Sequence, residues 1–154
     1  MDVKTALNKV EALCSRQEYC RSDIRKKLIK WDISPDNIEK ILVSLIEEKF
    51  IDENRYANFF VRDKFKFNRW GRKKIWWQLK QKEVPPEIIE EALKQINKDE
   101  YTLTLEDVIK EKLRQVKNKE PIKQKAAIIR NAVSKGYEYQ EVIPIVEQLL
   151  LKND

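Results

Sequence analysis

The apolar residues of this sequence recur every three to four positions along most of its 154 residues, and the same stripes return after about 51 residues. The three-to-four spacing is typical of helices that bury one face. One such helix is predicted to begin at Pro35, because Ser34 suits the N-cap, proline suits the first helical position and Asp36 suits the first turn. Its apolar stripe consists of Ile38, Ile41, Leu42, Leu45 and Ile46.

A second stripe lies 51 residues further on, behind Pro85 and Pro86, and predicts another copy of the same helix. Shifts of 51 residues and then of 53 superimpose apolar positions along the rest of the chain as well. This indicates a repeat of about 50 residues, present three times, with units predicted at 1–51, 52–98 and 99–154. The second stripe is Ile88, Ile89, Ala92, Leu93 and Ile96. Two superimposed series are Ile24, Ile75 and Ile128, and Ile33, Val84 and Tyr137.

Each repeat is predicted to contain three helices, so the expected fold class is all-α, with three tandem three-helix repeats forming an elongated, curved array. The chain has only two glycines and five prolines, too few for the turns of a β-sandwich or the loops of a doubly wound sheet. A repeat of this size is small for a core of its own, so neighbours are expected to share apolar surface. The predicted helices are 3–17, 22–31, 35–49, 53–67, 72–82, 86–97, 104–118, 121–135 and 139–151.

Three local signals in the third repeat refine these boundaries. Thr104, followed three residues later by Asp107, resembles a capping box and predicts a helix start. Gly136 is expected to end the eighth helix. Pro144 falls inside the ninth helix, which it is expected to kink or to delay.

Most catalytic and metal-binding chemistries lack their usual residues here. Without a histidine, the chain can build no Ser-His-Asp triad and no His-ligated metal site. Cys14 and Cys20 cannot complete a tetrahedral zinc site, and we expect two inert, partly buried thiols. Gly-rich phosphate-binding motifs are absent. We therefore expect no enzyme, no catalytic residue, no metal ion and no cofactor.

The hydropathy pattern predicts a cytoplasmic chain that does not enter a membrane. Its longest apolar run is the four residues from Ala126 to Ile129, far shorter than a membrane-spanning helix. The N-terminus shows no basic and apolar signal segment.

Positive charge is concentrated in residues 62–82, which we call the basic segment. It contains nine basic side chains and one acid, Asp63, so its net charge is +8, whereas the whole chain carries +6. This concentration is typical of a surface that binds a polyanion or an acidic partner, although a solvated helix face is the simpler alternative. The candidate binding residues are Arg62, Lys64, Lys66, Arg69, Trp70, Arg72, Lys73, Lys74, Trp77 and Lys80.

Aromatic residues alternate with these charges. On helix 72–82 the core stripe is predicted to be Ile75, Trp76 and Leu79, which turns Trp77 outward. An outward tryptophan among lysines could stack on bases, anchor a protein interface or pack against a neighbouring repeat. Trp70 lies in a loop, where the core explains it less well.

The following helix argues against sequence-specific reading of a DNA groove. Residues 87–97 carry three glutamates, which DNA phosphates would repel from the position of a recognition helix.

Four short motifs occur in a characteristic order: Ser22-Asp-Ile-Arg-Lys-Lys-Leu28, Ile51-Asp52-Glu-Asn-Arg55-Tyr56-Ala57, Arg72-Lys-Lys-Ile75 and Leu79-Lys-Gln-Lys. In order and spacing they resemble the RecX family of regulatory proteins. The resemblance covers residues 3–97 well, whereas the C-terminal repeat agrees in size and layout but offers few motif residues.

The sequence departs from the family pattern at a few positions. Lys49 and Glu83 stand where the family usually has helix-ending glycines, and Glu53 replaces a second aspartate. Because non-glycine residues resist the left-handed conformation, Lys49 and Glu83 are expected to weaken their helix ends. The pair Trp76 and Trp77 also departs from the more polar family pattern, so the resemblance implies no stacking role for it.

The resemblance implies a non-enzymatic regulator of RecA-type recombinases, acting in DNA repair, recombination and the SOS response. Such a protein lies in the groove of the recombinase–DNA filament and inhibits ATP hydrolysis, strand exchange and filament growth. The implied partners are the RecA-type filament and DNA, mainly single-stranded DNA within the filament, and we expect a monomer. The family positions Asp52, Arg55, Tyr56 and Ala57 are interpreted as structural: an N-cap, a helix-dipole or salt-bridge arginine, and packing residues.

Two alternatives from other functional classes stay open. The chain could be an autonomous, non-sequence-specific nucleic-acid-binding protein that uses the same basic segment. It could also be a helical scaffold that does not bind nucleic acid.

Overall fold

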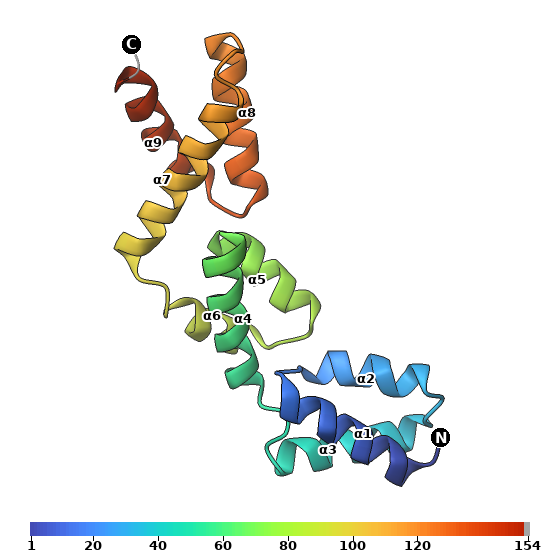
Figure 1. Ribbon diagram of the computed structural model, residues 1–154. Helices are drawn as coiled ribbons and strands as arrows, with labels where there is room; N and C mark the ends of the chain where they lie inside the picture. The colour runs from blue at the N-terminus through green and yellow to red at the C-terminus, as the bar shows by residue number, and fades with distance from the viewer. Residues whose placement is uncertain (153–154) are drawn as a thin grey trace. The chain divides into compact units, whose positions relative to one another are not determined.

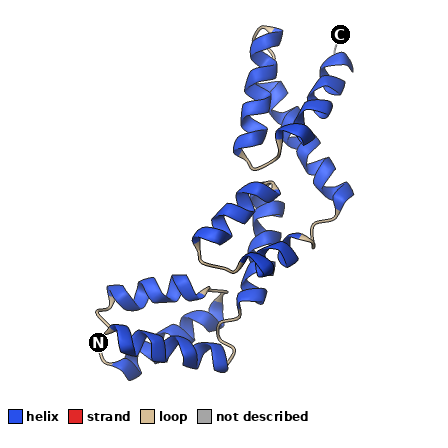
Figure 2. Ribbon diagram, turned by 180° about the vertical axis from the view of Figure 1, so that it is seen from behind, coloured by secondary structure: helices blue, strands red, loops and turns tan. Residues whose placement is uncertain are grey.

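The computed structural model describes residues 1–152, which form nine helices joined by short loops (Figure 1). Within this range no strand is present (Figure 2), and the all-α class is confirmed. The helices are α1 (Val3–Arg16), α2 (Arg21–Lys30), α3 (Pro35–Glu47), α4 (Glu53–Asn68), α5 (Arg72–Gln81), α6 (Pro86–Leu93), α7 (Lys98–Gln115), α8 (Pro121–Ser134) and α9 (Tyr139–Lys152).

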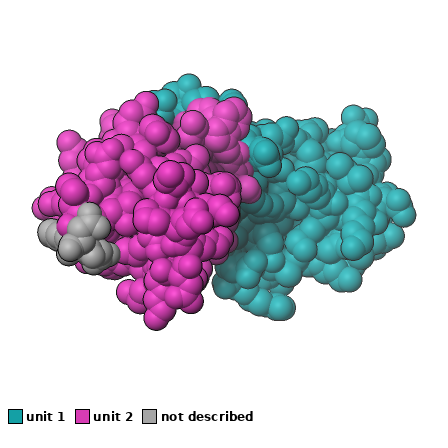
Figure 3. All heavy atoms as spheres, turned by 90° about the horizontal axis from the view of Figure 1, so that it is seen from above, with its two compact units in different colours: residues 1–60, 79–92 teal, residues 61–78, 93–154 magenta. Residues whose placement is uncertain are grey.

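The chain divides into two compact units, each formed by two segments (Figure 3). Unit 1 contains residues 1–60 and 79–92, and unit 2 contains residues 61–78 and 93–154. The first half of α4 and the end of α5 therefore belong to unit 1, while the rest of these helices belongs to unit 2. The three-repeat boundaries remain a prediction from the sequence.

The core of unit 1 forms where the apolar stripes of its first three helices meet. α1 contributes residues spaced by four positions, Ala6, Val10 and Cys14, which share one helix face. On α3 the predicted stripe is buried except for Ile46, which is 42% exposed. Ser34 accepts a hydrogen bond from the backbone N–H of Asn37, as expected for the N-cap. The main core residues are Ile24, Leu28, Ile38, Ile41, Leu42, Leu45 and Ile51.

The same helix-ending motif closes α2, α5 and α8. In each case the residue after the C-cap has a positive φ angle, 59° at Asp32, 63° at Glu83 and 104° at Gly136. The amide of the next residue donates back across the last turn, as the Val84 amide does to the Leu79 carbonyl, which is the Schellman arrangement. The apolar residues that follow, Ile33, Val84 and Tyr137, are all buried. They form one of the series that the repeat superimposes.

The boundary between α6 and α7 differs from the sequence-based prediction. α6 ends at Leu93 rather than at residue 97, and α7 begins at Lys98 rather than at Thr104. Asn97 is the N-cap, because its side-chain oxygen accepts hydrogen bonds from the amides of Asp99 and Glu100. The predicted capping box at Thr104 is therefore wrong.

Two other local predictions concern Pro144 in α9 and the two cysteines. α9 begins at Tyr139 and continues through Pro144, so the proline does not delay the helix start. Cys14 and Cys20 are free thiols, and burial raises the pKa of Cys14 to about 11 and of Cys20 to about 12. Thiols with such pKa values are unreactive near neutral pH.

Of the helices in residues 1–152, none is long and apolar enough to cross a bilayer.

Candidate functional site

The basic segment covers the second half of α4, the loop 69–71, α5 and the turn after it. Residues 62–78 belong to unit 2 and hold every candidate residue except Lys80, which belongs to unit 1. The exposed candidates are Arg62, Lys66, Arg69, Lys73, Trp77 and Lys80. The half-buried candidates are Lys64, Trp70, Arg72 and Lys74.

Trp70 is a platform for two lysines. The Nζ atom of Lys64 lies 5.2 Å from the centre of the Trp70 ring, and the Nζ atom of Lys74 lies 4.5 Å from it. Cation–π attraction at these distances holds both ammonium groups beside the ring. A base that stacked on Trp70 would compete with these lysines for the ring. The structure thus gives Trp70 a role in positioning positive charge.

Arg72 is held by Tyr101 from α7. Its backbone amide donates to the Tyr101 hydroxyl at 3.1 Å, and its guanidinium lies 3.9 Å from the centre of the same ring. Burial raises the pKa of Tyr101 to about 12, so the phenol stays neutral over the physiological range. A stacked guanidinium keeps its charge and its in-plane donors, and can therefore still bind a phosphate.

Arg69 is fixed by both its side chain and its backbone. Its Nη1 atom lies 2.7 Å from the Oε2 atom of Glu111, and its carbonyl accepts a 2.9 Å hydrogen bond from the Tyr137 hydroxyl. The ion pair is exposed, so it contributes little stability and can be exchanged for a phosphate. The Arg69 backbone has φ 56°, a left-handed conformation that marks the end of α4.

The only two glycines of the sequence meet beside this loop. The Gly71 amide donates to the Lys135 carbonyl at 2.7 Å, and the Lys73 amide donates to the Gly136 carbonyl at 3.1 Å. A Cβ atom added to Gly71 would lie 2.4 Å from the Gly136 carbonyl carbon, closer than real contacts allow. The loop 69–71, which we call the basic loop, is therefore hydrogen-bonded to the turn between α8 and α9. Sequence reasoning missed this contact, for which the scarcity of glycine was the only signal.

Trp77 faces outward, as its position in the helical period predicted. It is 55% exposed, whereas Ile75 and Leu79 on the same helix are fully buried. Trp76 was expected in the core but is only half-buried, and its ring meets the Trp77 ring edge to face at 5.2 Å. This contact supports the outward ring of Trp77 from one side.

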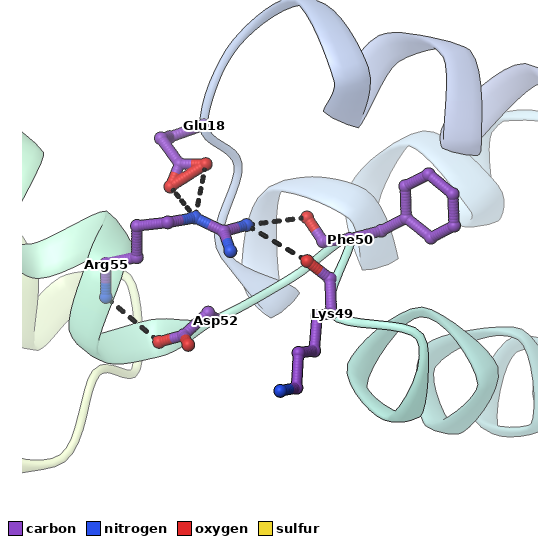
Figure 4. A network of polar contacts seen from close by, with 5 residues as sticks. All are labelled: Glu18, Lys49, Phe50, Asp52 and Arg55. Carbon is purple, nitrogen blue, oxygen red and sulfur yellow. Dashed lines mark hydrogen bonds and ion pairs between the residues drawn. The ribbon is translucent and has the colours of Figure 1, made fainter.

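The family positions at the start of α4 are structural residues of unit 1 (Figure 4). The Asp52 carboxylate accepts a hydrogen bond from the Arg55 amide at 3.0 Å, which makes Asp52 the N-cap. The Arg55 side chain donates to Glu18 and, at 3.2 Å each, to the carbonyls of Lys49 and Phe50 (Figure 4). Tyr56 and Ala57 are buried. Arg55 thereby links the loop that follows α3 to the loop between α1 and α2.

Together, the basic residues of unit 2 offer fixed positive charge beside an outward aromatic ring. The positive charges can contact phosphates, and the outward ring of Trp77 can stack on unpaired bases. The arrangement is suited to a nucleic-acid strand.

A comparison with protein families finds one matching model, described as RecX, second three-helix domain, over residues 52–93. The matched range contains α4, α5 and α6, and with them the whole basic segment.

Similar curated proteins carry the name regulatory protein RecX. The one from Prosthecochloris aestuarii is 29% identical over 149 residues, which are 97% of this chain and 96% of that protein. The one from Clostridium botulinum (strain Eklund 17B) is 33% identical over 129 residues, which cover 82% of this chain and 60% of that protein. This chain therefore spans less than two thirds of the clostridial relative.

Among solved structures, the crystal structure of RecX from Lactobacillus salivarius has the same fold. It superimposes with a TM-score of 0.82, covers 97% of each chain and is 23% identical in sequence.

Proposed function

We propose that this chain, which is similar to RecX regulatory proteins over most of its length, is a regulator of the RecX type that binds filaments of a RecA-type recombinase on DNA and inhibits their ATP hydrolysis, strand exchange and growth. The chain acts without catalytic chemistry of its own, as a cytoplasmic monomer in DNA repair, recombination and the SOS response. Its contact with DNA is mainly with the single strand held in the filament.

The observation that carries this proposal is the positioned charge of unit 2. Residues 62–78 contain seven basic side chains against the single acid Asp63. Trp70 holds Lys64 and Lys74 in place, and Tyr101 holds Arg72. The crossing of Gly71 with Gly136 fixes the loop that lies between these residues. Charge that is ordered before binding loses less side-chain entropy on contact with a polyanion. A filament of recombinase on DNA presents such a polyanion along its length.

The proposal is tested by measuring DNA-dependent ATP hydrolysis of a RecA-type recombinase, with this chain added below one copy per recombinase monomer. We expect inhibition at these low ratios, because a chain that blocks filament growth affects many subunits. Inhibition that appears only when the chain saturates the free DNA would instead favour an autonomous nucleic-acid-binding protein. No inhibition at any ratio would refute the proposal.

A charge variant and a matched control locate the surface. The test variant replaces four exposed cations of the basic segment by glutamine, and the control replaces four exposed cations of α7 and the turn after it. Both remove the same charge from unit 2, and surface changes of this kind rarely alter stability by more than about 0.5 kcal/mol. We expect only the test variant to lose inhibition. The test positions are Arg62, Lys66, Arg69 and Lys73, and the control positions are Lys110, Arg114, Lys117 and Lys119.

The alternative function rests on the same cations and predicts a strong salt dependence on naked DNA. If five of them contact phosphates, the slope of log affinity against log salt is about −4. A filament regulator binds the recombinase filament more tightly than naked DNA at the same salt concentration, and this comparison separates the two functions.

A further inference from the structure

The second helices of the three predicted repeats are α2, α5 and α8. All three are positively charged, but the basic segment includes only α5. α2 has five basic residues and one acid, α5 has four and none, and α8 has three and none. The helices that follow them, α3, α6 and α9, each carry more acidic than basic residues. Positive charge therefore recurs in unit 1, on α2, outside the segment that the sequence marked.

Three of the five cations of α2, the helix labelled in Figure 1, line one groove together with the Tyr19 ring: Lys26, Lys27 and Lys30. Lys26 and Lys30 are exposed and lie one turn apart, about 6 Å along the helix axis. The Nζ atom of Lys27 lies 5.7 Å from the centre of the Tyr19 ring. The face formed by these lysines, the α2 face, borders an open groove of about 460 Å³, lined by Tyr19, Asp23, Lys26, Lys27 and Lys30.

The one acid of α2 is neutralised from elsewhere in unit 1. Asp23 accepts a 2.8 Å hydrogen bond from the Nζ atom of Lys82, and its other oxygen accepts a weaker one from the Cys20 amide. Burial opposes ionisation of Asp23, but these hydrogen bonds outweigh it and hold its pKa below the usual value. Lys82 is thus used within the fold. Among residues 1–152, the lysines of the α2 face have no acidic partner, so their charge stays available.

We propose that the face formed by Tyr19, Lys26, Lys27 and Lys30 is a second nucleic-acid surface, which binds the phosphate backbone of a single strand. Lys26 and Lys30, one turn apart on one helix face, can meet successive phosphates, and the half-buried Tyr19 ring positions the Lys27 ammonium group beside them. The phosphates of a strand recur at a regular spacing along its backbone, as these lysines do along the helix, whereas the carboxylates of a protein surface have no such fixed spacing. The inference deepens the proposed function, since it rests on DNA as a partner, but it does not require the recombinase.

Two nucleic-acid surfaces on one chain would act together. Once one unit binds a strand, the other is held near the same strand at a high effective concentration, so the overall affinity exceeds that of either surface alone. Loss of the α2 face should therefore weaken binding even though the basic segment is intact.

The test is binding of a labelled single-stranded oligonucleotide to the full chain, measured by fluorescence anisotropy at several salt concentrations with no recombinase present. The test variant is Lys26→Gln, Lys27→Gln and Lys30→Gln. The control variant is Lys4→Gln, Arg16→Gln and Lys40→Gln, which removes the same charge from exposed sites of unit 1. Should the triple variant unfold, Lys26→Gln with Lys30→Gln changes only the exposed pair.

We expect the test variant to raise the Kd about tenfold or more and to reduce the magnitude of the salt slope by about 2, because about 0.7 is lost for each phosphate contact with a single strand. The control should change both values much less. Equal effects of the two variants would overturn the proposal. Unchanged oligonucleotide binding with weakened recombinase inhibition would also overturn it, and would assign the face to an acidic protein. Loss of oligonucleotide binding remains informative even if the chain inhibits no recombinase, so the two proposals can fail separately.

Discussion

The contact between Gly71 and Gly136 makes the sharpest stability prediction, and the perturbation is Gly71→Ala. The added Cβ atom would lie 2.4 Å from the carbonyl carbon and 2.5 Å from the oxygen of Gly136, and 2.6 Å from the amide nitrogen of Tyr137. All three are backbone atoms. Because a backbone cannot rotate away as a side chain can, the basic loop and the turn between α8 and α9 must separate.

The magnitude follows from what this separation costs. Overpacking costs about 1–3 kcal/mol. The two backbone hydrogen bonds across the contact, from Gly71 to Lys135 and from Lys73 to Gly136, contribute about 1 kcal/mol each. Replacing glycine by alanine also restricts the unfolded chain, which returns about 0.4–1 kcal/mol. We therefore expect a net loss of about 2–4 kcal/mol in the free energy of unfolding.

Urea denaturation followed by tryptophan fluorescence measures this loss where it occurs. Three of the four tryptophans, Trp70, Trp76 and Trp77, belong to unit 2, so the signal reports mainly on the unit that contains the contact. Asn68→Ala, at the exposed end of α4, is the matched control and should change stability by about 0.5 kcal/mol at most.

Gly136→Ala should cost at least as much as Gly71→Ala. At Gly136 the φ angle of 104° is unfavourable for any residue with a Cβ atom, and the new atom would lie 2.6 Å from the Lys74 amide nitrogen. A Gly71→Ala protein as stable as the wild type, or a Gly136→Ala protein more stable than Gly71→Ala, would refute the reasoning.

Two further predictions concern unit 1. Lys49→Gly and Glu83→Gly should each raise the unfolding free energy by about 0.5–1 kcal/mol. Both residues have φ angles near 60°, so glycine removes a left-handed penalty of about 1–2 kcal/mol at some cost in chain entropy. No gain in the urea midpoint would contradict this prediction. Lys82→Gln should cost about 1 kcal/mol near neutral pH. Since the folded state lowers the pKa of Asp23, this stabilisation is present above the ordinary aspartate pKa of 3.8 and is lost as the pH falls through the folded pKa. Denaturation of both proteins at pH 7 and in acid checks this, and a constant difference would argue against the ion pair.

The sequence predicted the helices well because their signals are local. The stripe after Ser34 and the buried positions Ile24, Ile75 and Ile128 follow from the three-to-four period alone. The prediction failed between α6 and α7, where Asn97 rather than Thr104 caps the helix. Both residue types suit an N-cap, and the choice between them depends on where the preceding chain leaves the core.

The sequence predicted which residues make up the candidate site but not how these residues are arranged in space. A run of nine cations is visible in the sequence, and so is the outward position of Trp77. Their partners are not visible, because Arg69 pairs with Glu111 and Lys82 with Asp23 across long stretches of chain. The same holds for α2, whose one acid is cancelled only once the fold brings Lys82 to it.

By itself, then, the sequence determined that this chain is helical, where most helices begin and end, and which stretch is most basic. Those properties depend on neighbours within one or two helical turns, which are neighbours in sequence as well. The tertiary structure alone decided that the two glycines meet, that Tyr101 and Tyr137 hold the basic loop, and that Lys82 neutralises Asp23. Each of these depends on residues that are distant in sequence and become neighbours only when the helices pack.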